Sequence, residues 1–64
     1  MELLKVGEVA ERLRISRALV YRLCATGQLP VVRIGFAVRI SAEALEAWLE
    51  RMVQMPGEEV KGGD

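Results

Sequence analysis

The stretch ISRALVYRLCATGQLP, residues 15–30, decides the fold, because it holds the start and stop signals of one complete helix. Ser16 is a candidate N-cap, since its hydroxyl can accept a hydrogen bond from a free backbone N–H of the first turn. Three apolar residues follow at helical spacing: Val20, Leu23 and Cys24. Gly27 suits the left-handed position after a helix, and Pro30 prevents continuation. These signals predict a helix over residues 17–26.

A shorter helix is predicted just before this stretch. Four apolar residues recur at i, i+3, i+4 and i+7, which is one face of a helix: Val6, Val9, Ala10 and Leu13. The helix should begin at Lys5 or Val6 and end at Leu13 or Arg14. Because only two or three residues then separate it from the next helix, the pair is expected to form a helix-turn-helix.

After Pro30 the apolar period changes to two, which predicts a β-hairpin over residues 31–40. Gly35, Phe36 and Ala37 are expected to form a three-residue tip. In that register Arg33 stands directly opposite Arg39. Like charges facing each other across a hairpin are destabilising, so the pair makes most sense if an anion neutralises it.

A third helix is predicted from Ala42 to Met52 or Val53, with Ser41 as its N-cap. Its apolar stripe is Leu45, Trp48, Leu49 and Met52. The expected fold is therefore mainly α with a small β-hairpin: three helices and a two-stranded hairpin in one domain over residues 1–53. Residues 54–64 are polar and glycine-rich, and we expect a disordered C-terminal tail there.

The charges of the 64 residues cancel, with nine Lys and Arg against nine Asp and Glu, but they are unevenly distributed. Residues 12–39 hold six arginines and no acidic residue, whereas residues 1–11 and 40–64 carry net negative charge. Because the shape of the field matters more to a polyanion than the total charge, the zero total does not exclude nucleic-acid binding. It predicts a dipolar module that binds in one orientation, and modestly as a single copy.

The remaining composition excludes several classes of protein. The chain has no histidine and one cysteine, which leaves no His-based metal site, no catalytic dyad and no internal disulfide. With no paired carboxylates or phosphate-cradling glycine loop, we expect no enzyme, no catalytic residue, no metal and no cofactor. No apolar stretch is long enough to cross a bilayer, and a lone cysteine fits a reducing compartment. We therefore expect a cytoplasmic protein without a membrane or small-molecule partner.

On a helical wheel, the exposed side of the helix at 17–26 carries arginines, small residues and a tyrosine, with no acid to repel phosphate. Small residues let a helix approach the floor of a DNA groove, and arginine can bond guanine bidentately. The arginines of the hairpin extend the same acid-free surface. An ordinary solvated surface is the alternative interpretation, and Tyr21 fits a half-buried packing position equally well.

Phe36, at the expected hairpin tip, has three open interpretations. It can pack against the core, which is the expected outcome, insert into a DNA groove, or contact another protein. Cys24 and Trp48 lie on apolar stripes and are expected in the core. The candidate DNA-contacting residues are Ser16, Arg17, Ala18, Tyr21, Arg22, Arg33, Gly35, Phe36 and Arg39.

An ordered series of short motifs runs along the chain: LLKVGEVA at 3–10, ISR at 15–17, VYRL at 20–23, GQLP at 27–30, VRIG at 32–35, VRI at 38–40 and LEAWL at 45–49. The series resembles the excisionase-family DNA-binding domain, a winged helix-turn-helix related to MerR-type regulators. The resemblance implies that the helix at 17–26 enters the major groove and that the hairpin at 31–40 is a wing on the backbone or minor groove. The contacts it carries over are Ser16, Arg17, Tyr21 and Arg22 in the recognition helix, and Arg33 and Arg39 in the wing.

The same resemblance implies an excisionase, which is a recombination directionality factor, or a small transcriptional regulator. Its partners would be double-stranded DNA, with an integrase or recombinase or further copies of itself on that DNA. The sequence departs from the family at three single positions, which usually carry a Ser or Thr cap, a turn glycine and a Thr: Lys5, Arg14 and Leu19. The wing tip of the family is also often more basic than Gly35-Phe36-Ala37. The alternative function is a protein-interaction module that keeps the winged fold with weak or no DNA binding.

Overall fold

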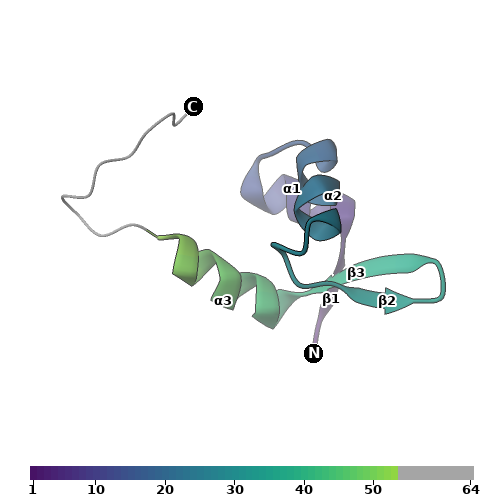
Figure 1. The fold of residues 1–64 in the computed structure, drawn as a ribbon. Coiled ribbons are helices and arrows are strands. Elements are labelled where there is room, and N and C mark those ends of the chain that lie inside the picture. The colour runs from purple at the N-terminus through teal and green to yellow at the C-terminus, as the bar shows by residue number, and fades with distance from the viewer. Residues whose placement is uncertain (54–64) are drawn as a thin grey trace.

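The computed structural model describes residues 1–53 of the chain (Figure 1). Its elements in chain order are β1 (Leu3–Lys5), α1 (Val6–Leu13), α2 (Arg17–Ala25), β2 (Val32–Ile34), β3 (Ala37–Ser41) and α3 (Ala42–Met52). All three predicted helices are confirmed, and only α2 is one residue shorter than expected. The predicted tail at 54–64 lies outside the described residues.

The sheet has three strands rather than the two of the predicted hairpin. Its order is β1-β3-β2, and both pairings are antiparallel. The sequence did not predict β1, because three residues are too few to show an alternating pattern. Leu4 of β1 pairs with Ile40 of β3, and both side chains are buried, so β1 extends the apolar face of the sheet.

The hairpin between β2 and β3 has a two-residue loop, Gly35-Phe36, so the predicted three-residue tip is wrong. Gly35 has φ +59° at the first loop position, where a type II′ turn requires a positive φ and where glycine is favoured. The shorter loop shifts the register by one residue and pairs Arg33 with Val38 and Arg39 with Val32. Because cross-strand partners share a face and neighbours alternate, Arg33 and Arg39 lie on opposite faces, and their predicted opposition is wrong.

One hydrophobic core joins the helix pair to the sheet. Val9 of α1, Val20 of α2 and Ile40 of β3 have no exposed surface, and Cys24 and Trp48 are buried as predicted. Figure 1 shows α1 and α2 packed together, with the hairpin and α3 extending in opposite directions. No helix within residues 1–53 is long and apolar enough to cross a membrane.

Both predicted serine caps are formed. The Ser16 Oγ accepts from the Leu19 N–H at 3.1 Å, and the Ser41 Oγ accepts from the Ala44 N–H at 3.2 Å. Each bond satisfies a backbone donor that the first turn of a helix leaves free. α2 and α3 therefore begin directly after the two capping serines, as the sequence predicted.

Neither β1 nor β3 is separated from its following helix by a linker. Lys5 ends β1 and is the N-cap of α1, and Ser41 ends β3 and is the N-cap of α3. The turn from α1 to α2 is also tight: Arg14 has φ 58°, and its N–H bonds back to α1 carbonyls. Arg14 thus occupies the left-handed position after a helix, where glycine is the residue usually favoured.

Candidate functional site

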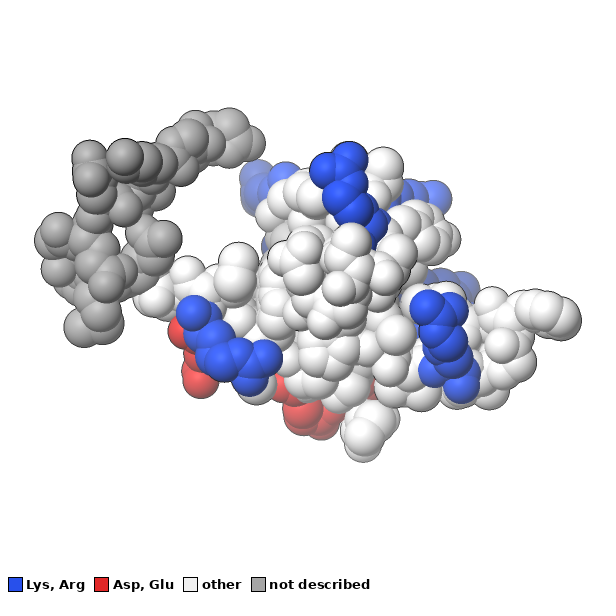
Figure 2. Space-filling view, in the orientation of Figure 1, with Lys and Arg blue, Asp and Glu red and all other residues white. Residues whose placement is uncertain are grey.

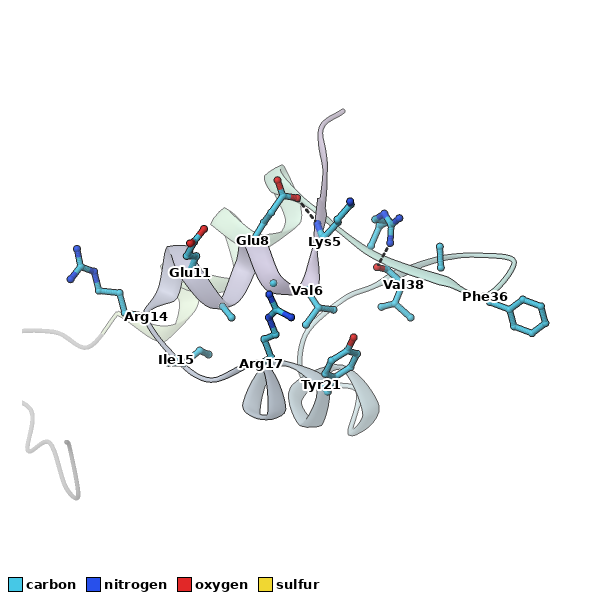
Figure 3. Close-up of a pocket in the computed structure, with 14 residues that line it drawn as sticks. Lys5, Val6, Glu8, Glu11, Arg14, Ile15, Arg17, Tyr21, Phe36 and Val38 are labelled. Carbon is cyan, nitrogen blue, oxygen red and sulfur yellow. Dashed lines mark hydrogen bonds between the residues drawn. The ribbon is translucent and has the colours of Figure 1, made fainter.

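A concave surface of about 1120 Å³ lies between the α1–α2 pair and the β2–β3 hairpin (Figure 3). We call it the helix–hairpin groove. It is open to solvent, and the residues that line it come from β1, α1, α2, the turn between the helices, the hairpin loop and β3. Its cationic and aromatic side chains are Lys5, Arg14, Arg17, Arg39, Tyr21 and Phe36. Segments far apart in the sequence thus present one continuous surface.

The groove carries more positive than negative charge. Four cationic side chains line it against two carboxylates, those of Glu8 and Glu11. Glu8 is engaged at the start of α1, where its Oε1 accepts from the Lys5 N–H at 2.8 Å. Among residues 1–53, the single ion pair joins Arg12 and Glu2, at 4.0 Å and outside the groove. The groove arginines therefore have no carboxylate partner in the described part of the chain, and an anion can approach them.

Arg17 lies across the gap between the two helices. A Cβ built on Gly7 of α1 would stand 3.1–3.2 Å from three atoms of the Arg17 guanidinium, so the absence of a side chain there makes room for it. Figure 3 shows Arg17 reaching from the start of α2 toward α1. The missing side chain at Gly7 thus leaves room for the Arg17 guanidinium against α1. Sequence reasoning missed this role, because a single glycine in a helical pattern carries no sign of its neighbour.

Arg39 faces a different cation from the one predicted. It pairs with Lys5 in the β1–β3 register, which places two positive side chains on one face of the sheet at the groove. The Arg39 Nη1 donates to the Val38 carbonyl oxygen at 3.0 Å. The sheet therefore contains a like-charge pair, Lys5 and Arg39, between β1 and β3. The sequence did not predict this pair because it did not predict β1.

The two aromatic side chains of the groove are both exposed. Tyr21 is 56% exposed, and Phe36 is fully exposed at 107%. The expected packing of Phe36 against the core is wrong, because the two-residue loop carries the ring beyond the reach of the core. In Figure 3 the Phe36 ring points away from the body of the protein.

The structure brings only part of the candidate set into the groove. Arg17, Tyr21, Phe36 and Arg39 line it, while five others do not: Ser16, Ala18, Arg22, Arg33 and Gly35. Of these five, Ser16 uses its hydroxyl as a cap, and Ala18 and Arg22 are exposed on α2. The groove also contains Lys5 and Arg14, which the candidate set lacked, although both belong to cationic residue types that the sequence displays. All these roles as DNA contacts stay predictions.

Arg33 lies on the hairpin face that also carries Val38 and Ile40, close enough to α2 for its charge to act on Cys24. Burial raises the pKa of the Cys24 thiol, and the positive charge of Arg33 acts in the opposite direction. The raised pKa keeps the thiol protonated and inert at neutral pH. Cys24 is therefore a packing residue.

The acidic residues of α3 lie away from α2 and the hairpin. In Figure 2 the blue side chains lie over α2, the hairpin and the last turn of α3, whereas the red ones lie along the lower edge, under α3. Glu43, in the first turn of α3, accepts a hydrogen bond from the Ser41 hydroxyl at 3.2 Å. Hydrogen bonds from its own backbone N–H and from Ser41 hold the pKa of Glu43 below its ordinary value of 4.5. The molecule is thus electrically polarised.

Comparison with known proteins agrees with this architecture. Residues 3–53 match the family described as "Helix-turn-helix domain". Two curated proteins of Mycobacterium tuberculosis, from strains CDC 1551 and H37Rv, are each named "Putative DNA-binding protein" and are 47% identical to the chain over 49 residues.

That matched segment is 77% of this chain and 63% of each relative, so the chain spans somewhat less than two thirds of their length. No solved structure matches the chain. The family match covers both helices of the motif, the connecting turn and the sheet, which are the elements that build the groove. The chain therefore belongs to the helix-turn-helix domain family.

Proposed function

We propose that this chain is a winged helix-turn-helix module that binds double-stranded DNA, with α2 in the major groove and the hairpin as a wing on the neighbouring backbone or minor groove. The observation that carries the proposal is the net positive charge of the helix–hairpin groove, which is lined by four cationic side chains and only two carboxylates. Between a major groove and the next minor groove of a duplex runs a ridge of phosphates. A concave, positive surface between helix and hairpin suits that ridge.

The exposed residues of α2 suit base contacts. Ala18 is small and lets the helix approach the groove floor, and Arg17 carries the donors that can bond guanine bidentately. Arg17 stands in the first turn of α2, from which recognition helices contact base edges. Tyr21 can donate its hydroxyl to a phosphate. In this proposal Arg22, Arg33 and Arg39 chiefly neutralise phosphates.

Within this class we propose an architectural or regulatory role, as an excisionase or a small transcriptional regulator. The motif series from Leu3 to Leu49 supports this role, whereas the names of the two mycobacterial relatives support DNA binding alone. The further partners are an integrase or recombinase, or additional copies of the chain on the same DNA. Such a protein acts by binding and bending DNA, without a catalytic step.

The test is a titration of a mixed-sequence duplex over a range of salt concentrations. With four or five phosphates contacted, log K should fall against log salt with a slope of about −4. Arg22→Ala should weaken binding to every duplex, and Arg17→Ala should flatten the preference between sites by about 1–3 kcal/mol. Arg51→Ala, in the last turn of α3, is the matched control and should leave affinity almost unchanged. Affinity that does not depend on salt would contradict the proposal.

A second candidate function is a protein-interaction module that keeps the winged fold. The observations that favour it are the exposed Phe36 and the acidic side of α3, where Glu43, Glu46 and Glu50 line a shallow surface with Glu2. An NMR titration with duplex DNA separates the two candidates. Shifts confined to residues 14–39 favour DNA binding, and no response below millimolar DNA favours a protein partner.

A further inference from the structure

The tip of the β2–β3 hairpin combines an unpacked aromatic ring with a narrow backbone. Phe36 is fully exposed, and its neighbours are Gly35, with no side chain, and Ala37, with one methyl group. A phenylalanine that contacts no core residue contributes nothing to folding by burial and leaves its whole apolar surface in water. The small neighbours leave the ring as the most prominent group of the tip. Such a shape fits insertion into a narrow space.

The hairpin carries one arginine on each face. Arg33 pairs with Val38 and Arg39 with Val32, so the two guanidinium groups leave the ribbon on opposite sides. Neither has a carboxylate partner among residues 1–53, and the sequence from residue 12 to residue 42 contains no acid. A minor groove is bounded by a phosphate strand on each side. A ribbon entering it with its tip can therefore bring a cation to each strand.

We propose that Phe36 is a wedge that enters the minor groove and partly unstacks one base-pair step, while Arg33 and Arg39 contact the phosphates of the two opposite strands. This inference rests on the proposed DNA binding and adds a mechanism for distorting the duplex. Apolar side chains inserted between base pairs kink DNA, and the extra phosphate contacts offset the cost of unstacking. The preferred steps are the flexible ones, TA and CA/TG.

The charges around the ring favour a duplex over a protein as its occupant. An apolar patch that docks on a protein is usually surrounded by a mixed polar rim, and charged residues are depleted from its centre. Here the hairpin carries one arginine on each face, and residues 31–42 contain no acidic residue. Two phosphate strands flanking an apolar stack of bases are the complementary surface.

The experiment relaxes a closed circular plasmid with a type I topoisomerase in the presence of the protein, then removes the protein and resolves the topoisomers. Partial intercalation unwinds the duplex, so the plasmid should emerge with a reduced linking number, and no target sequence needs to be known. Phe36→Ala should abolish most of this shift, and Phe36→Leu should retain part of it, because leucine is also an apolar wedge. Plasmid binding is measured in parallel by gel shift.

The matched control is Ile34→Ala, which removes another exposed apolar side chain, at the last residue of β2 and outside the two-residue loop, and should leave the linking number unchanged. Phe36 has no core contact, so circular dichroism should show the same fold for the Phe36→Ala variant. If wild type and Phe36→Ala bind the plasmid and give the same linking number, the wedge is refuted while DNA binding stands. If the wild type does not bind the plasmid, the proposed function itself fails.

Discussion

Replacing Gly7 with alanine should stabilise the fold and weaken DNA binding at the same time. Gly7 lies in α1 without a positive φ, so an L-residue fits its backbone, and glycine in a helix is less stable than alanine by about 0.5–1 kcal/mol. The new Cβ would stand 3.1–3.2 Å from the Arg17 guanidinium, which must retreat by a few tenths of an ångström. This guanidinium is the end of a flexible, exposed side chain, so it can move at small cost.

Thermal unfolding followed by circular dichroism checks the stability. The gain of about 0.5–1 kcal/mol corresponds to a melting temperature higher by about 2–8 °C for a chain of this size. In an Arg17→Ala background the same substitution meets no guanidinium, and the difference between the two gains measures the cost of moving it. Duplex affinity, measured at constant salt, should fall by less than it does for Arg17→Ala alone.

Gly35→Ala is the contrasting control. No atom lies within 4 Å of the position of its Cβ, but its φ of +59° disfavours any L-residue by about 1–2 kcal/mol. Gly7, which has close neighbours, should therefore tolerate alanine, whereas Gly35, which has none, should not. If Gly7→Ala destabilises the protein, Arg17 is locked in place and the reasoning is refuted. If its affinity for DNA is unchanged while Arg17→Ala binds weakly, the contact with Gly7 does not position the arginine.

Three further predictions follow from the caps and the buried thiol. Arg14→Gly should stabilise the fold by about 1 kcal/mol in urea denaturation, because φ 58° suits glycine, and should weaken duplex binding because the groove loses a cation; equal or lower stability would contradict this. The lowered pKa of Glu43 means that its contribution to stability is complete above about pH 4.5 and is lost as the pH falls through the folded-state pKa; Ser41→Ala should raise that pKa in a carboxyl NMR titration, and an unchanged value would refute the role of the hydroxyl. Cys24, buried and with a raised pKa, should react with iodoacetamide only when the protein opens, so its labelling rate should rise with urea, and rapid labelling of the native protein would be inconsistent with its burial.

The sequence was most informative where structure depends on local interactions. The caps Ser16 and Ser41 and the apolar stripes act within a few residues, so the three helices were predicted almost to the residue. The strand β1 depends instead on pairing with β3, more than thirty residues later in the chain, and three residues carry no periodic signal of their own. The part of the fold that depends on pairing between distant residues could therefore not be predicted from the sequence.

The candidate site shows the same limit. Residue type predicted which side chains are cationic, but the hairpin register decides which face each one occupies. A loop one residue shorter than expected moved Arg33 and Arg39 to opposite faces and left Phe36 outside the core. The support of Arg17 by Gly7 is a contact between two helices, and neither residue indicates the other in the sequence.

The absence of linkers around the sheet gives the molecule a fixed span. Lys5 is at once the last residue of β1, the cap of α1 and the cross-strand partner of Arg39, so the angle between the helix pair and the hairpin is set by hydrogen bonds rather than by a flexible joint. The helix pair and the hairpin therefore keep a fixed relative orientation and a fixed separation. On DNA the protein would select duplexes by the width and curvature of the backbone between its two points of contact, and the duplex would have to deform to fit the protein.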